Sequence, residues 1–306
     1  MKSILFVTAF YDIGREKWNY KNKEYKYQRD NEDYHQSFIQ LANNLNYDLH
    51  VYLEKKDIPR LRSRVSKKNI IFFDIDNIKD KLFITKYYNL ESQIIKSNNY
   101  QKKLSRETKF KPEHLYSLYN LINHDKVNFV YQSYLQNKNY DYYSWIDYGF
   151  LKQHQNTQNK LIPRDINFNL LSDNKIIYQS LEYNIPKKSP IIMLSTNKVY
   201  IAGTFWICPK RLVGHYQKIY HQELKRFHNL KIVDDDQNLV LQLVLKHTNL
   251  FKLYYLKNFM VLWLFLLNKP DQDSKRNKAI VARVGSSATK KTLKKSYSKK
   301  KIKNLE

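Results

Sequence analysis

Apolar residues in the first third of the chain fall into short runs separated by one helical pattern. Residues 3–10 are an apolar run of strand length, and residues 48–53 and 69–75 are two more. Between them, residues 31–46 place apolar side chains on one helical face, with Asn31 as the expected cap: Tyr34, Phe38, Leu41 and Leu45. Strand, helix and strand in succession predict a parallel sheet with right-handed crossovers.

The rest of the chain continues this mixed pattern. Residues 79–111 are polar, and we expect them to be mobile in parts, whereas Pro112 opens a helical segment that reaches Phe129. Residues 140–150, 175–181, 191–194 and 199–207 predict further strands, with Gly203 marking a bulge or a close backbone approach. Pro209 is expected to start a helix that runs to about residue 228. The pattern therefore predicts one α/β domain over residues 1–270.

Candidate chemistry begins in the aromatic run 140–150, where Asp147 follows a predicted strand and Gly149 marks the turn after it. The carboxyl end of a strand in an open α/β sheet borders the ligand crevice, so Asp147 can face a metal or a polar ligand. The alternative is that Asp147 caps the following turn. The first predicted strand ends similarly, in a loop with Asp12, Gly14 and Arg15 that suits a phosphate group.

Three acids in a row, Asp234, Asp235 and Asp236, precede a predicted helix that contains Leu239. One of them is sufficient as a helix cap, so another is free to face the crevice as a general base. Capping alone remains the alternative. Lys126, in the helical segment after Pro112, is either a phosphate ligand in the crevice or an ordinary surface lysine.

A second acidic pair, Asp74 and Asp76, ends the strand predicted at 69–75. Two carboxylates in alternation on a strand end can hold a metal ion or a ribose. A strand terminus followed by a turn explains the pair equally well.

Several of these motifs resemble the HtrL/YibB family, which includes WlaTC-like proteins. The resemblance rests on residues 7–15 with Trp18, Arg29 and Tyr34, on Tyr119-Asn120 with Lys126, and on residues 145–149. Residues 202–205 and 234–236 resemble the later motifs, so the matches run in order from about residue 3 to residue 245. The family is similar to glycosyltransferases of the GT-A fold, which use a nucleotide-sugar donor and often a divalent metal.

The resemblance implies a GT-A-like (Rossmann-like) mixed, mainly parallel sheet flanked by helices, and transfer of a sugar from a UDP-sugar or related donor to a glycan acceptor. It implies Mn²⁺ or Mg²⁺ as the cofactor with Asp147 as the ligand, although Tyr148-Gly149 stands where many GT-A enzymes carry a second acid. Asp235 or Asp236 is the expected catalytic base. The residues expected to bind the nucleotide sugar are Thr8, Phe10, Asp12, Arg15, Arg29, Lys126, Trp145, Gly203 and Thr204.

The charge of the chain supports a competing interpretation. A formal net charge of +26 and 26 tyrosines suit a non-enzymatic protein that binds nucleic acid. Twelve of the basic residues follow residue 274, in a segment, 271–306, that is rich in Lys and Ser and is expected to be a disordered tail. The tail is a candidate contact for polyanions, and nearly half of the net charge belongs to it.

Other features bear on the cellular compartment. Cys208 is the only cysteine, so no intrachain disulfide can form, as expected for a reducing, cytoplasmic setting. The apolar start of the chain is short and lacks a cleavage site, which predicts a first strand rather than a signal peptide. Residues 259–267 are strongly apolar but too few for a transmembrane segment, so they predict a core element, with interfacial attachment as the alternative.

Overall fold

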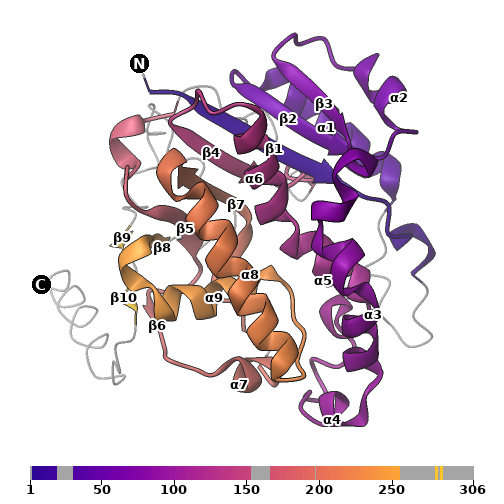
Figure 1. The fold of residues 1–306 in the computed structure, drawn as a ribbon, viewed down its shortest axis with the longest axis vertical. Coiled ribbons are helices and arrows are strands. Elements are labelled where there is room, and N and C mark those ends of the chain that lie inside the picture. The colour runs from indigo at the N-terminus through magenta and orange to yellow at the C-terminus, as the bar shows by residue number, and fades with distance from the viewer. Residues whose placement is uncertain are drawn as a thin grey trace, which may run out of the picture.

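The computed structural model describes residues 2–18, 30–152, 166–196, 198–255, 280–281 and 283–284. An eight-stranded sheet forms its centre (Figure 1). The strands, in the order in which they lie across the sheet, are β3 (Ile70–Asp74), β2 (Asp48–Leu53), β1 (Ile4–Phe10), β4 (Tyr142–Ile146), β7 (Ile201–Pro209), β5 (Ile176–Ser180), β8 (Phe251–Tyr255) and β9 (Ile280–Val281).

Six of these strands run in one direction, because β7 is antiparallel to both of its neighbours and β9 is antiparallel to β8. The pairs β3–β2, β2–β1, β1–β4 and β5–β8 are parallel. The sheet is therefore mixed and mainly parallel, as predicted. A small second sheet pairs β6 (Asn184–Ile185) with β10 (Arg283–Val284).

Helices cover both faces of the large sheet, which explains why its central strands are buried along most of their length. The α-helices are α1 (Asn31–Asn44), α2 (Ile58–Arg62), α3 (Phe83–Lys96), α4 (Asn98–Gln101), α5 (Ser117–His124), α6 (Lys126–Gln136), α7 (Pro190–Leu194), α8 (Val213–Asn229) and α9 (Asp236–Lys246). Short 3₁₀ turns join some of them, among them η3 (Ile75–Lys81), η4 (Pro112–His114) and η8 (Lys210–Leu212).

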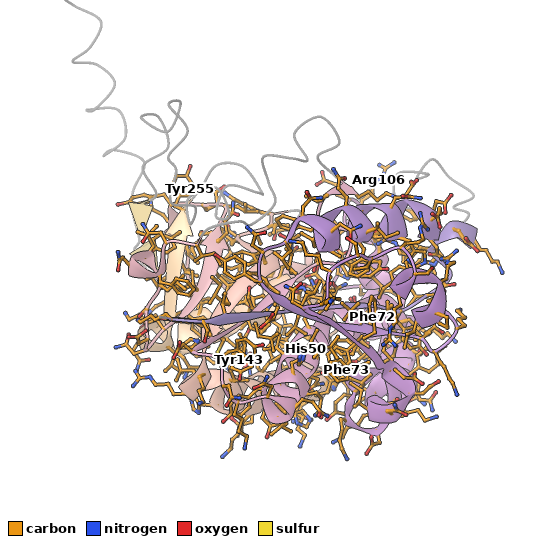
Figure 2. All side chains as sticks on the ribbon, turned by 90° about the horizontal axis from the view of Figure 1, so that it is seen from above. His50, Phe72, Phe73, Arg106, Tyr143 and Tyr255 are labelled. Carbon is orange, nitrogen blue, oxygen red and sulfur yellow. The ribbon has the colours of Figure 1, made fainter. Side chains whose placement is uncertain are left out.

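Two hydrophobic clusters lie on opposite faces of the sheet. Leu5 and Val7 of β1 pack with side chains of α3, α5, α6, α8 and α9, whereas Ile4 and Phe6 pack with those of α1 and α2. The alternation follows from the two-residue repeat of a strand. Figure 2 views the layers at right angles to Figure 1 and labels His50, which is buried beside Phe73 with 4.8 Å between the ring centroids.

The strands expected at 3–10, 48–53, 69–75 and 175–181 are confirmed to within one residue at each end, as β1, β2, β3 and β5. The strand in the aromatic run is β4, and the strand expected at 199–207 is β7, which is shifted by two residues. The helix expected at 31–46 is α1. Its cap is Asp30 rather than Asn31, because the Asp30 carboxylate accepts the Glu32 N–H at 2.8 Å.

Residues 79–111 include helices that their polar pattern did not predict, and the mobility expected for parts of the segment stays a prediction. The segment contains the 14-residue helix α3 and the short helix α4, and its start depends on a distant residue. Two backbone amides at the start of α3, those of Phe83 and Ile84, donate to the Asp125 carboxylate at 2.6 and 3.0 Å. Asp125 also interrupts the helical segment expected from residue 112 to 129, which the structure divides into η4, α5 and α6.

Two shorter predictions also failed. Residues 191–194 were expected to form a strand but belong to α7, in which Pro190 is at the first position and the Ser189 hydroxyl caps the Ile192 N–H. These are helix-start signals, and the apolar run concealed them. Pro209 was expected to start a helix, but it ends β7, and α8 begins at Val213 after η8.

The described part of the segment 271–306 joins the sheets: β9 pairs with β8 and β10 pairs with β6. The expectation of disorder from residue 271 therefore does not hold for these four residues. The apolar run 259–267 lies outside the described residues. Within the described part of the chain, no helix is long and apolar enough to span a membrane.

Candidate functional site

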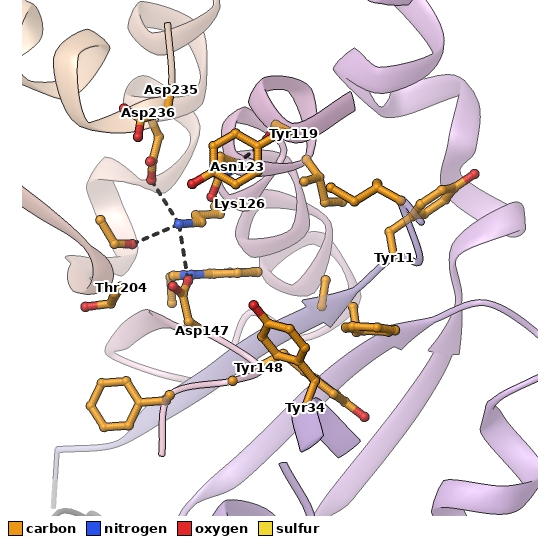
Figure 3. A pocket seen from close by; sticks show the side chains of 18 of the residues that line it. Tyr11, Tyr34, Tyr119, Asn123, Lys126, Asp147, Tyr148, Thr204, Asp235 and Asp236 are labelled. Carbon is orange, nitrogen blue, oxygen red and sulfur yellow. Dashed lines mark hydrogen bonds and ion pairs between the residues drawn. The ribbon is translucent and has the colours of Figure 1, made fainter. Parts of the chain in front are cut away.

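A cavity of about 410 Å³ opens at the carboxyl ends of β1 and β4. These strands are neighbours, and the chain continues from β1 to one side, through β2 and β3, before it returns to β4 on the other. Ligands of open α/β sheets bind at such a switch point, and the volume suits a small-molecule ligand. The walls come from β1, β4, β7, the start of α1, helices α5 and α6, and the start of α9 (Figure 3).

Lys126, the first residue of α6, lies buried in the wall of this cavity. Its ammonium is 3.2 Å from Asp147 Oδ1 and 3.1 Å from Asp236 Oδ2, and it donates to the Gly203 carbonyl at 3.2 Å (Figure 3). Burial by itself would lower the pKa of Lys126, but the charges of Asp147 and Asp236 outweigh it and raise the pKa. The surface-lysine alternative is therefore wrong, because Lys126 is a buried, permanently charged ammonium.

Asp147 follows β4 at the mouth of the crevice, as the aromatic run predicts. Its Oδ1 accepts the Trp145 indole N–H at 2.6 Å in addition to its contact with Lys126. The carboxylate contacts these two side chains rather than the amides of the following turn, which argues against the capping alternative. Its backbone N–H donates to the Thr204 carbonyl at 2.9 Å, which fixes Asp147 to the neighbouring strand β7.

Gly203 explains how Asp236 reaches Lys126. A Cβ atom at Gly203 would lie 2.5 Å from Asp236 Oδ2, a distance that real side chains do not adopt. Glycine therefore allows the start of α9 to approach β7. The pairing of β5 with β7 also changes register at Tyr178/Gln179, opposite this part of β7. The predicted irregularity at Gly203 thus places a carboxylate beside the ammonium.

The side chains of the three consecutive aspartates make different contacts. Asp235 caps α9 through Oδ1, which accepts the Gln237 N–H at 3.0 Å, and its side chain lines the cavity half-buried. Asp236 is buried and paired with Lys126. Asp234 contacts the start of α9 instead: Oδ1 accepts the Asp235 N–H at 2.9 Å and Oδ2 accepts the Asn238 amide at 2.7 Å.

Burial raises the pKa of Asp235 well above its usual range, and the charges of Asp234 and Glu113 raise it further. The pKa of Asp236 is also raised by burial, although Lys126 opposes that shift. A carboxylate with a raised pKa is a stronger base than an exposed one. Asp235 has the features expected of a proton acceptor, because only one of its oxygens is engaged by the cap and it borders the cavity.

Aromatic rings hold Arg15 at the opposite side of the cavity. Its guanidinium donates to the Tyr34 hydroxyl at 2.8 Å and lies 5.2 Å from the Trp18 ring centroid and 5.6 Å from that of Tyr119. Rings on several sides restrict the guanidinium, which stays positively charged at all relevant pH. Arg15 and Lys126 are the two cationic side chains among the described residues of the lining.

The residue before Arg15 also has a defined role. Gly14 has φ +71°, a left-handed conformation that favours glycine, and its N–H donates to the Asp12 carboxylate at 2.8 Å. Asp12 therefore shapes this loop and does not line the cavity.

The structure brings together nine of the residues predicted from the sequence. The cavity is lined by Phe10, Arg15, Lys126, Trp145, Asp147, Gly203, Thr204, Asp235 and Asp236. Thr8, by contrast, is fully buried in β1 away from the lining, and Arg29 lies outside the described residues. Asp74 and Asp76 do not line the cavity either, and Asp74 accepts the Asp76 N–H at 3.0 Å as the cap of η3.

Sequence reasoning did not assign several lining residues to the site, among them Tyr11, Tyr148, Asn123 and Gln237. Tyr34 had been placed on the apolar face of the predicted helix and in a family motif, but not in the site. Its ring lies across the backbone at Gly149, where a Cβ atom would come within 2.4 Å of it. The glycine after Tyr148 was thus the feature of the sequence that indicated a close contact between the backbone and an aromatic ring, that of Tyr34.

The assignment of Asp147 as the ligand of a divalent metal ion stays a prediction. A metal chelated by Asp147 and Asp236 together does not fit, because the Lys126 ammonium lies between these two carboxylates. The chain itself supplies the cation at this point of the site.

Comparison with known proteins gives a family but no activity. No curated protein was found to match the chain. The model of a bacterial protein family of unknown function, HtrL_YibB, matches residues 2–266, a span that contains all of the described cavity lining. By this match over most of its length, the chain belongs to the HtrL_YibB family.

Proposed function

We propose that this protein is a glycosyltransferase of GT-A type, which moves a sugar from a nucleotide-sugar donor to a hydroxyl group of a glycan acceptor. One observation carries the proposal: a buried ammonium, Lys126, and a half-buried carboxylate of raised pKa, Asp235, line the same cavity at the switch point of the sheet. An inverting transfer from a nucleoside diphosphate sugar uses both groups. A cation stabilises the leaving diphosphate, and a base accepts the proton of the acceptor hydroxyl.

The donor would bind along β1 and α6. Tyr11 and Tyr34 line this part of the cavity and offer partly exposed rings to a nucleobase or a sugar (Figure 3). Arg15 would donate two parallel hydrogen bonds to the diphosphate, and the ammonium of Lys126 would contribute a second positive charge. A UDP-sugar is the donor that the resemblance favours.

The acceptor would enter beside the start of α9. In an inverting reaction, the acceptor oxygen forms a bond to the anomeric carbon while the bond from that carbon to the diphosphate oxygen breaks. The hydroxyl proton passes to Asp235, and the electron pair of the broken bond leaves with the diphosphate, whose new charge Arg15 and Lys126 would stabilise. Asp236 has a positioning role in this scheme, because it holds Lys126 from the side of α9.

The competing proposal, binding of nucleic acid, gains no support from this cavity. Three carboxylates, those of Asp147, Asp235 and Asp236, line it against the two cations Arg15 and Lys126, and an acidic lining disfavours a polyanion. Most of the basic segment after residue 274 lies outside the described residues.

The substitution Asp235→Asn tests whether Asp235 is the general base. Asparagine is as good a helix cap as aspartate, so α9 keeps its cap while the base is removed. We expect transfer or donor hydrolysis to fall by about 10²- to 10⁴-fold, with donor affinity nearly unchanged in a thermal-shift titration of UDP-sugars. Asp74→Asn is the matched control, because Asp74 caps η3 through the same two-residue contact, at 3.0 Å, outside the cavity.

Two outcomes would refute the proposal. Normal turnover by a folded Asp235→Asn variant would exclude Asp235 as the base. The absence of any thermal shift with nucleotide sugars, with and without Mn²⁺, would reject the donor class as a whole.

A further inference from the structure

A second, smaller cavity of about 40 Å³ lies behind the acidic triplet, between η4, the segment that precedes β7, and α9. Asp235 and Gln237 line both cavities, so the two spaces share a wall. Four polar side chains of the smaller cavity form a group that we call the Glu113 cluster, consisting of Glu113, His114, Asp234 and Asn238. Glu113 and Asp234 act on the proposed transfer site only through their charges, which raise the pKa of Asp235.

Three members of the cluster have the geometry of metal ligands. Glu113, His114 and Asp234 each offer one ligand atom, and these atoms all lie within 4.8 Å of one another. Bonds of about 2.0–2.2 Å to a shared ion place tetrahedral ligand atoms about 3.3–3.6 Å apart. A closing movement of about 1 Å would therefore complete the site, and the cavity has room for an ion and a water molecule or two.

The proton arrangement of His114 leaves one ring nitrogen available. The Tyr100 hydroxyl donates its proton to the Val233 carbonyl at 2.8 Å, so it must accept from His114 Nδ1, which lies 2.7 Å away. His114 therefore carries its proton on Nδ1 and a lone pair on Nε2. A donor bond from the second ring nitrogen to a fixed partner is typical of histidines that bind metals.

Asn238 supplies an independent sign of a missing ligand. Its side chain is only 7% exposed, and its amide group donates to Asp234 Oδ2 at 2.7 Å. Its Oδ1 is buried and has no hydrogen-bond partner among the described residues. A buried amide oxygen without a partner is costly, and a cation would satisfy it.

The charges around the small cavity do not balance. Three carboxyl groups line it, those of Glu113, Asp234 and Asp235. The ammonium of Lys111 lies 3.5 Å from Glu113 Oε1 and is paired with it. Lys198 also lines the cavity, but its ammonium is paired at 2.9 Å with a carboxylate that does not line it. Carboxyl groups therefore outnumber ammonium groups around this cavity.

We propose that the Glu113 cluster is a binding site for a first-row divalent cation of the Mn²⁺ or Zn²⁺ type. Two carboxylates, an amide oxygen and an imidazole nitrogen suit these ions, and the nitrogen disfavours Ca²⁺ and Mg²⁺. The bound ion would join η4 to the start of α9 and so fix the wall that carries Asp235. The inference does not depend on the proposed transferase activity, because it concerns a different cavity and a binding measurement.

Metal binding by the full chain tests the proposal. Chelator-treated protein is dialysed to equilibrium against MnCl₂ or ZnCl₂, and the bound metal is counted by mass spectrometry. The variants are Glu113→Gln and His114→Gln, and Asp147→Asn is the control, because its carboxylate lies in the other cavity. We expect one ion per chain for wild type and Asp147→Asn, and at least tenfold weaker binding for both cluster variants. The ion should also raise the melting temperature of wild type.

Three results would contradict the proposed metal site. Metal binding that weakens only in Asp147→Asn would place the ion in the larger cavity instead. Affinities within twofold of wild type for both cluster variants would also overturn the site, as would the absence of bound ion at about 1 mM free metal. If Glu113→Gln does not fold, as judged by circular dichroism, the same comparison is made with His114→Gln and with Asn238→Leu.

Discussion

Lys126→Met should show how much the fold depends on its internal ammonium. The substitution keeps a long side chain but leaves the carboxylates of Asp147 and Asp236 without their shared cation. Removing one partner of a buried pair costs about 3–5 kcal/mol. Asp147 is 30% exposed and so partly screened by water, whereas Asp236 is 8% exposed, and we therefore expect a loss of about 3 kcal/mol in the free energy of unfolding.

The loss should depend on pH in a defined direction. The pKa of Asp236 in the folded protein is raised by burial, and Lys126 opposes this shift, so removal of Lys126 raises the pKa further. A carboxyl group whose pKa is higher when folded binds more protons in the folded state. Its contribution to stability is therefore present below its unfolded pKa of about 4 and is lost as pH rises towards the folded pKa. The variant should be markedly less stable than wild type at pH 8 and closer to it at pH 5.

Urea unfolding at the two pH values measures this effect, with Lys152→Met as the control. Lys152 pairs with Asp33 at 2.7 Å, but the Asp33 side chain is 58% exposed, so its loss should cost less than about 1 kcal/mol. Adding Asp236→Asn to Lys126→Met should recover part of the stability, because the buried charge is then removed. A loss below about 1 kcal/mol that is equal at pH 5 and pH 8 would refute the reasoning.

Three further predictions concern other parts of the molecule. Gly203→Ala should displace the Asp236 carboxylate from Lys126, because the new Cβ would lie 2.5 Å from Oδ2, and should reduce transfer activity at least tenfold while the circular dichroism spectrum stays that of wild type. Asp125→Ala should lower the free energy of unfolding by about 2 kcal/mol or more, measured in urea, because Phe83 and Ile84 lose the acceptor of their amides; a cost under 0.5 kcal/mol would contradict this assignment. Truncation after residue 284 should leave the melting temperature within a few degrees of that of the full chain. Truncation after residue 270 removes β9 and β10 and should lower the melting temperature clearly. Equal melting temperatures for the two truncated proteins would show that these strands do not stabilise the sheets.

Much of the fold followed from the sequence because its signals are local. An apolar run of five to seven residues in a buried parallel strand is visible without its partners, and β1, β2, β3 and β5 were predicted on that basis. The position of Asp147 after β4 followed from the same pattern. The cap of α9 by one member of the acidic triplet was also predictable, because Asp235 bonds an amide only two residues away.

Other features were undetermined by the sequence because their causes lie far along the chain. Helix α3 has no side-chain cap of its own, and the acceptor of its first amides is Asp125, more than 40 residues later. A lysine in a helical pattern is usually exposed, and only packing shows that Lys126 is buried between β4, β7 and α9.

The position of the site was therefore predictable, but the pairing of its charged side chains was not. The sequence determined which residues lie at the carboxyl ends of the strands, because the apolar runs show where each strand ends. Tertiary structure alone decided that Lys126, rather than a bound ion, lies between Asp147 and Asp236, because Gly203 allows α9 to approach β7 closely enough. Local periodicity places a charged residue along the chain, but the partner that neutralises a buried charge depends on which elements pack against it.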